Sequence, residues 1–286
     1  MKNKLLIVFY FLSASSFAQS GWFVRPNFSY NKVSMLNSEN ALNTVLIEQP
    51  SFNQIFGLDL GFQFTDEKSG LYAISAGVLS NPITLNYKGT YDQVGAPFWD
   101  SESTLKLNYI TIPINFEFAL LKQKKITPIA SIGVHVSRLT SYYDDIKVID
   151  KKRPEYNETY IIENGSYTEK YNKFTLNATL NQWYYTKWLF GIHSALGAKI
   201  KINKRWNATM RIQGSFNIND TENKAVITHT TNGYGKLVYN PYEYYYAKIA
   251  RRYPYMGERG ISRNLIVGVQ VGISYLFIKG YRVSIL

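Results

Sequence analysis

The chain has 286 residues, a formal net charge of +12 and a high aromatic share of 16% that includes 24 tyrosines. The absence of cysteine excludes a disulfide framework and a lipid-modified N-terminal cysteine. The basic residues are scattered along the chain, so the positive charge does not indicate nucleic-acid binding.

The N-terminus has the pattern of a secretory signal peptide. Lys2 and Lys4 precede an apolar run from Leu5 to Leu12, and small residues surround Ala18 where signal peptidase would cleave. We therefore expect residues 1–18 to be a signal peptide that is removed on export. No later stretch reaches the ~18 uninterrupted apolar residues of a transmembrane helix. If the mature chain enters a membrane, it does so as strands.

Eight later segments alternate apolar and polar residues with the period of two that is typical of strands. The clearest is LNYITIPINFEF, residues 107–118, where one face carries Ile110, Ile112 and Ile114 and the other carries Asn115 and Glu117. Pro113 lies in the middle of this strand and has no backbone donor, which predicts a bulge or a missing ladder bond. In chain order the predicted strands are residues 21–31, 56–65, 71–79, 107–118, 128–138, 188–201, 206–217 and 265–277.

The connections between these strands alternate between long and short. Short links at 66–70, 119–127 and 202–205 would lie at one end, and long links at 32–55, 80–104, 139–187 and 218–264 at the other. A soluble sandwich gives no reason for this rhythm, whereas an outer-membrane barrel has tight periplasmic turns and extended outer loops. We therefore predict that residues 19–286 form an all-β, eight-stranded, antiparallel up-and-down transmembrane β-barrel in a bacterial outer membrane.

The segment at 107–114, LNYITIPI, resembles the YLxIP strand of the PorT-like outer-membrane β-barrel family of Bacteroidetes. As in that family, it is followed by a turn with lysines at 122–125 and by a strand that begins PIASIG at 128–133. The sequence GISYLF at 272–277 resembles the signal that the outer-membrane assembly machinery reads on a last strand. The resemblance implies an outer-membrane barrel and a link to protein secretion and gliding motility.

The polar faces of the predicted strands carry charged and histidine side chains that would meet inside the barrel. Eight strands enclose an interior that side chains fill, so we expect these groups to pair with one another and not to line a pore. Two histidines without a nearby cysteine or carboxylate make a weak metal site, and we predict neither metal nor cofactor. The predicted lumen cluster is Arg25, Asp59, Glu117, His135, His193, Lys199 and Arg211.

The last long loop has the most unusual composition, because eight tyrosines are interleaved with basic residues between Tyr234 and Tyr255. Tyrosine offers a flat apolar face and a hydroxyl group, which suits binding to sugars or proteins and also suits the membrane interface. Some of these residues would project outward as a binding surface. The candidate binding residues are Tyr239, Tyr242, Tyr244, Tyr245, Tyr246, Arg251 and Arg252.

Two functions remain open from the sequence. The first is a non-enzymatic surface protein that contacts outer-membrane lipid and binds a polysaccharide or an envelope protein, or assists secretion machinery. The second is a rim enzyme that modifies lipid or peptide, with His229 in the last loop near Ser215, Asp220 and Glu222. No Gly-x-Ser-x-Gly stretch, His-Glu-x-x-His helix or phosphate-binding glycine loop is present, so we predict no catalytic residues.

Overall fold

The computed structural model describes residues 21–36, 47–66, 70–91, 99–119, 125–150, 153–171, 174–179, 183, 185–221 and 262–278. The predicted signal peptide, residues 1–18, lies outside these ranges, so its removal stays a prediction. Among the described residues no helix is long and apolar enough to cross a membrane.

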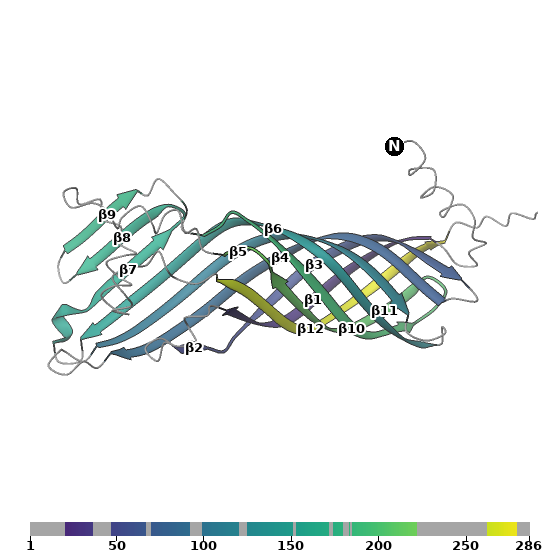
Figure 1. The fold of residues 1–286 in the computed structure, drawn as a ribbon, viewed down its shortest axis with the longest axis horizontal. Helices are drawn as coiled ribbons and strands as arrows, with labels where there is room; N and C mark the ends of the chain where they lie inside the picture. The colour runs from purple at the N-terminus through teal and green to yellow at the C-terminus, as the bar shows by residue number, and fades with distance from the viewer. Residues whose placement is uncertain are drawn as a thin grey trace, which may run out of the picture.

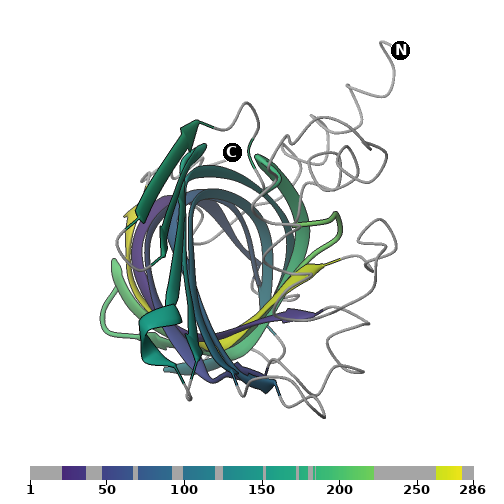
Figure 2. The same cartoon turned by 90° about the vertical axis from the view of Figure 1, so that its left-hand side faces the viewer.

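Eight antiparallel strands form a closed ring, which is seen from the side in Figure 1 and end-on in Figure 2. Along the chain each strand pairs with the next one of the ring, and β12 pairs with β1 to close it. All eight predicted strands and their up-and-down order are therefore confirmed. The ring strands are β1 (Gly21–Leu36), β3 (Ser51–Asp66), β4 (Gly70–Tyr91), β5 (Trp99–Ala119), β6 (Ile126–Asp150), β10 (Trp188–Lys201), β11 (Trp206–Asn217) and β12 (Arg263–Ile278).

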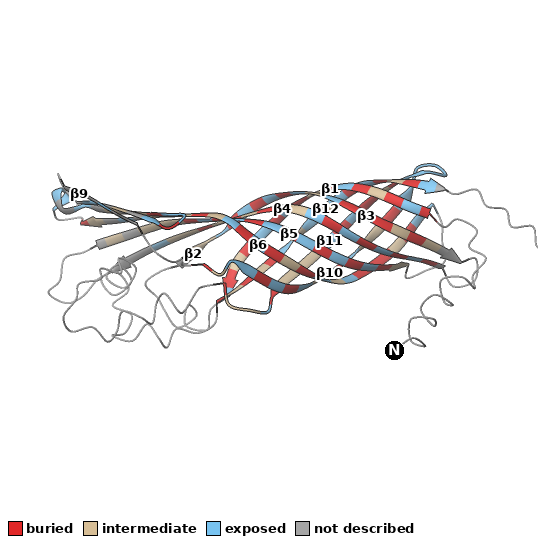
Figure 3. Cartoon of the chain, turned by 90° about the horizontal axis from the view of Figure 1, so that it is seen from above, coloured by how far each residue is buried: buried red, intermediate tan, exposed pale blue. Residues whose placement is uncertain are grey.

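The two faces of the ring differ in the way the alternation predicts, as the striped colouring in Figure 3 shows. On β5, Ile110 and Ile114 are 47% and 52% exposed on the outside, whereas Glu117 is 2% exposed on the inside. An exposed apolar belt of this extent is found where a protein meets hydrocarbon, and a closed ring leaves no unpaired edge there. Every ring strand contributes to the belt, for example through Trp22, Leu58, Ile74, Ile114, Val134, Ile192, Ile212 and Val269.

Aromatic side chains gather on the outside at the end of the barrel where the short links lie. Trp22 meets Phe62 edge-on with ring centroids 5.4 Å apart, and Trp206 meets Tyr275 in the same way at 4.9 Å. Arg205, in the link between β10 and β11, donates from Nη1 to the Tyr275 hydroxyl at 3.1 Å. Such a girdle marks a membrane interface, and the short links identify it as the periplasmic one.

Three strands continue far beyond the belt, and the predicted loops at 80–104 and 139–187 are wrong in this respect. β4 and β5 remain paired up to Tyr91 and Trp99, and β5 and β6 up to Trp99 and Asp150. The period of two continues and odd-numbered residues face inward along all of this part of β5, but above Ile110 the inward side chains, Tyr109 and Leu107, are apolar and the outward one, Asn108, is polar. Beyond the membrane the outer face of the sheet meets water and is polar, and the apolar side chains lie on the inner face.

Shorter strands extend this outer sheet. β7 (Glu158–Glu163) pairs with the outer half of β6, and β8 (Ser166–Tyr171) and β9 (Phe174–Thr179) follow in order, after the 3-10 turn η2 (Pro154–Tyr156). β2 (Ile47–Gln49) pairs with the outer part of β4. Asn164 and Gly165, with φ of 46° and 90°, form the tight β7–β8 turn, which is the residue pair that such turns favour. The alternation pattern predicted no strand in this region.

Pro113 is accommodated without a bulge of its own. The β4–β5 ladder is interrupted between the pairs Ala76–Ile114 and Leu79–Thr111, and the register is the same on both sides of the gap. The register shift lies instead in the β5–β6 ladder between Asn108 and Tyr109, where β6 carries the extra residue Thr140. The missing ladder bond is therefore confirmed, because a proline cannot donate to a neighbouring strand.

Candidate functional site

The centre of the lumen is a buried ion-pair cluster contributed by four strands. Arg25 of β1 donates from Nε and Nη2 to Oδ2 of Asp59 on β3, at 3.1 and 3.0 Å. Its Nη1 donates to Oε2 of Glu117 on β5 at 2.8 Å. Arg211 of β11 reaches the same carboxylate oxygen with Nη1 at 3.2 Å. All four side chains are at most 4% exposed, so the pairs are shielded from water and tie opposite walls of the barrel together.

Strand register and glycines bring these groups into contact. Arg25 lies directly opposite Asp59 in the β1–β3 ladder, and Asp59 lies opposite Gly77 on β4. A Cβ at Gly77 would lie 2.8 Å from the Leu58 carbonyl oxygen and still closer to the Asp59 carboxylate. Gly197 faces Arg211 in the β10–β11 ladder and leaves room for its side chain in the same way. Asp59 and Arg211 therefore each lie over a neighbour that has no side chain.

Lys199 adds a third cation to the lumen. Its Nζ donates to Oε1 of Gln63 at 2.5 Å, from β10 across the barrel to β3. Together with Arg25 and Arg211 it gives three buried cations for the two carboxylates of Asp59 and Glu117. Glu117 pairs with two of these cations, and removing one partner of a buried charge is costly.

The two predicted lumen histidines come together on the neighbouring strands β6 and β10. In the β6–β10 ladder His135 lies opposite Gly191 and His193 lies opposite Gly133, so each histidine ring lies over a glycine of the neighbouring strand. The centroids of the two rings are 6.0 Å apart. Nε2 of His135 is 2.9 Å from the Asn217 side-chain oxygen, and His193 contacts the Asn115 side-chain oxygen. No group of three or more potential metal-ligating side chains occurs among the residues described. These histidines are thus held by amide side chains.

A cavity of about 70 Å³ lies beside the cluster, between Arg25, Asn115, His135, His193 and Arg211. Nε and Nη2 of Arg211 and Oε1 of Glu117 are buried and have no hydrogen-bonding partner in the protein. A cavity needs roughly 10–15 Å³ for each water molecule that it holds. The space and the free polar atoms therefore suit a small group of bridging water molecules and not a substrate.

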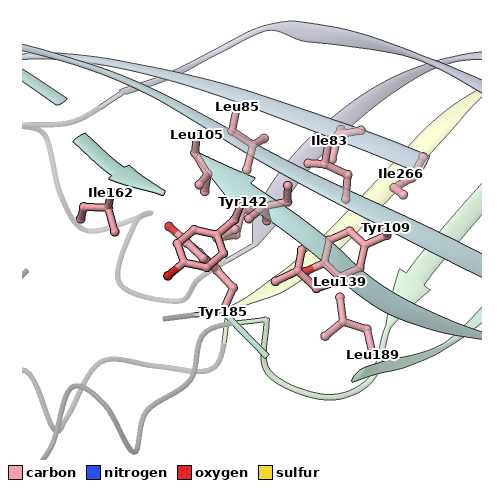
Figure 4. Close-up of a cluster of buried hydrophobic side chains, with 13 residues drawn as sticks. Ile83, Leu85, Leu105, Tyr109, Leu139, Tyr142, Ile162, Tyr185, Leu189 and Ile266 are labelled. Carbon is pink, nitrogen blue, oxygen red and sulfur yellow. The ribbon is translucent and has the colours of Figure 1, made fainter. Parts of the chain in front are cut away.

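Apolar side chains seal the lumen at both ends. At the outer end thirteen buried residues fill the interior, as Figure 4 shows for ten of them around Tyr109, Tyr142 and Tyr185. At the periplasmic end Phe23, Ala73 and Leu276 form a smaller cluster. Among the described residues, the polar cluster thus lies between these two apolar groups. We call the larger set the outer plug: Val33, Met35, Ile83, Leu85, Leu105, Leu107, Tyr109, Leu139, Tyr142, Ile162, Tyr185, Leu189 and Ile266.

The structure places all seven predicted lumen residues inside the barrel, whereas the predicted loop site lies outside the described residues. Tyr239, Tyr242, Tyr244, Tyr245, Tyr246, Arg251 and Arg252 belong to this second group. For the alternative enzyme site, Ser215 lines the lumen cavity, and Asp220 accepts a hydrogen bond from the Ser262 backbone N–H at 3.1 Å. His229 and Glu222 are outside the described ranges.

Neither the outer plug nor the amide groups that hold the histidines were predicted from the sequence. A signal for the plug was present, because Leu105, Leu107 and Tyr109 continue the alternation in the opposite phase. Gly133 and Gly191 leave room for the histidine rings opposite them. Which residues lie opposite these glycines depends on the register between β6 and β10, which the sequence alone does not give.

The closed ring, its apolar belt and its sealed polar lumen define the chain as an outer-membrane β-barrel protein. No family model and no curated protein matches it. Among solved structures it is similar to Neisserial surface protein A, with 8% identity, a TM-score of 0.34 and coverage of 90% of this chain and 99% of the other. For the outer membrane protein OprG from Pseudomonas aeruginosa the identity is 9% and the TM-score 0.34, with coverage of 91% of this chain and 98% of the other. For the outer membrane protease OmpT from Escherichia coli the identity is 11% and the TM-score 0.39, with coverage of 93% of this chain and 99% of the other.

Proposed function

We propose that the barrel is a non-enzymatic anchor that presents a binding surface outside the outer membrane. The observation that carries this proposal is the contrast between the two halves of the molecule. Inside the belt the lumen is filled by the ion-pair cluster and the outer plug, and Phe23, Ala73 and Leu276 pack together at the periplasmic end. Outside the belt, β4, β5 and β6 continue into the sheet of β7, β8 and β9. This extended sheet thus lies outside the membrane, where it is accessible to partners.

The nature of the partner follows from the composition of the loops. The chain carries a formal net charge of +12, and the tyrosines and arginines between Tyr239 and Arg252 combine flat apolar faces with positive charge. This combination favours an acidic polysaccharide or an acidic surface of another envelope protein. The resemblance of residues 107–114 to the PorT-like family supports a role as an accessory component of secretion machinery.

The arrangement around Ser215 and Asp220 supports a non-enzymatic role. Ser215 lines the lumen cavity beside the buried ion-pair cluster. Asp220 holds the backbone at Ser262, which joins the start of β12 to the end of β11. This structural contact of Asp220 favours the non-enzymatic role.

Binding to dextran sulfate, with uncharged dextran as the reference, tests the proposed surface role. The full mature chain in lipid nanodiscs is expected to bind dextran sulfate and not dextran. Alanine at Tyr242, Tyr244, Tyr245 and Tyr246, combined with glutamine at Arg251 and Arg252, should weaken binding by at least about tenfold, because aromatic and arginine side chains dominate such contacts.

The matched control for this loop variant removes two positive charges at the other end of the barrel. Lys125 and Lys204 are exposed at the periplasmic turns, and their replacement by glutamine should leave binding unchanged. Equal losses in the loop variant and in the control would reduce the effect to net charge and count against a dedicated surface.

A further inference from the structure

Four cations form an arc around one side of the barrel. Lys106 lies on β5, Arg138 on β6, Lys187 directly before β10 and Arg263 at the start of β12. The strands β5, β6, β10, β11 and β12 are consecutive neighbours in the ring, so the arc covers a continuous half of the circumference. We call these four residues the outer arc.

The register places Arg138 at the outer end of the apolar belt and Lys106 further out on β5. Arg138 lies opposite Ile110 of β5 and Trp188 of β10. Ile110 is the outermost apolar side chain on the outer face of β5, and the next outward residues are Asn108 and Lys106. This is the depth at which the head groups of the outer leaflet begin, and long basic side chains extend toward it from a hydrophobic surface.

Each cation of the arc lies over an aromatic ring. Arg138 is 5.6 Å from the centre of the Trp188 ring on the outer face, and Lys187 is 4.9 Å from the centre of the Trp183 ring, which packs against the outer plug. Arg263 lies 5.6 Å over Phe216, and Lys106 lies 5.8 Å over Tyr143. A guanidinium group that covers a ring keeps its N–H edge available for an oxygen ligand.

The arc is also unbalanced in charge. Within the described part of the chain none of its four cations forms an ion pair, although Lys88 and Lys147 further out pair with Glu102 and Asp145. Nε of Arg263 is buried and has no hydrogen-bonding partner in the protein. On the opposite side of the rim, β3 and β4 present uncharged residues, among them Phe52, Gln54 and Ser80.

We infer that the outer arc binds the phosphate groups of an acidic lipid in the outer leaflet, with the acyl chains lying against the apolar belt below. Phosphate is the anion that arginine and lysine hold best at a membrane surface, through charge-assisted N–H···O bonds. The aromatic rings fix the cations in place, so little side-chain freedom is lost on binding. This lipid site is independent of the proposed loop surface, which involves different residues.

The experiment compares bisphosphorylated lipid A with the same lipid A after removal of its phosphates. Lipid binding to the folded mature chain in detergent micelles is followed by native mass spectrometry. The wild type should prefer the phosphorylated lipid. The variant K106Q/R138Q/K187Q/R263Q should lose at least about tenfold of this preference, since each basic residue contributes to attraction at the surface.

Two further variants keep the inference falsifiable. K125Q/K201Q/K204Q/R205Q removes the same charge at the periplasmic end and should keep the preference. R138K/R263K keeps the charge and should retain most of the preference for the phosphorylated lipid. Heat-modifiable migration on a gel confirms that every variant is folded. Equal binding of the two lipids by the wild type, or equal losses in the two quadruple variants, would overturn the inference.

Discussion

Replacement of Glu117 by glutamine is expected to lower the free energy of unfolding by about 3–5 kcal/mol, the usual cost of removing one partner from a buried ion pair. Glu117 is the carboxylate that contacts both Arg25 and Arg211, at 2.8 and 3.2 Å. Without its charge, the lumen retains three cations with Asp59 as the remaining carboxylate of the cluster. The measurement is a urea titration of folding into lipid vesicles, with the folded and unfolded bands separated on a gel.

Glu102 supplies the matched control on the same strand. It pairs with Lys88 at 2.9 Å, but both side chains are exposed to water. Glutamine at Glu102 should therefore change the free energy of unfolding by about 1 kcal/mol or less. If the two substitutions had equal effects, the lumen cluster would not be a buried one.

Replacement of Ile114 by lysine is expected to lower the free energy of unfolding by about 2–4 kcal/mol, because a charge on the lipid face costs most at the middle of the bilayer. Ile114 lies between Ala76 of β4 and Val134 of β6, well within the apolar belt. The same urea titration in lipid vesicles measures the effect.

The matched control for lysine at Ile114 is the same isoleucine-to-lysine change at a different depth in the membrane. Ile126 is 58% exposed and is the first residue of β6, beside the periplasmic turn. Lysine at Ile126 should cost about 1 kcal/mol or less, because its ammonium group reaches water. Equal costs at the two positions would mean that no hydrocarbon layer separates them.

The barrel could be predicted from the sequence because lipid imposes a simple rule on every ring strand. Ile110, Ile112 and Ile114 alternate with polar residues, and the short links of the turns divide the chain at regular places. Pro113 was informative as well, because a residue without a donor predicts a gap in the ladder whatever the neighbouring strand is.

The outer sheet could not be predicted in the same way, because the alternation changes phase where β5 leaves the membrane. Leu105, Leu107 and Tyr109 are apolar and face inward, whereas Ile110 and Ile112 are apolar and face outward. A search for one continuous apolar face ends at this phase change, although the strand does not. The Asn164–Gly165 turn was a local signal that this region contains further strands.

The members of the lumen cluster could be named from the sequence, but their pairs could not. Arg25 and Glu117 are on β1 and β5, which are not neighbours in the ring. Their contact depends on the tilt of the strands and on the width of the barrel, which are properties of the whole sheet. The same holds for Lys199 and Gln63, which meet across the lumen from β10 and β3.

The central claim is that hydrocarbon surrounds the apolar face of the closed ring, and a spin-label scan along β5 in lipid bilayers tests it most directly. The chain has no native cysteine, so single cysteines at 108, 110, 111, 112, 114, 115 and 116 can be labelled without background. Labels at 110, 112, 114 and 116 should be accessible to oxygen dissolved in the lipid but not to a water-soluble nickel chelate. Labels at 111 and 115 should be accessible to neither, and a label at 108 should be accessible to the chelate. Access of the chelate to 112 and 114, or oxygen access without alternation, would contradict the claim.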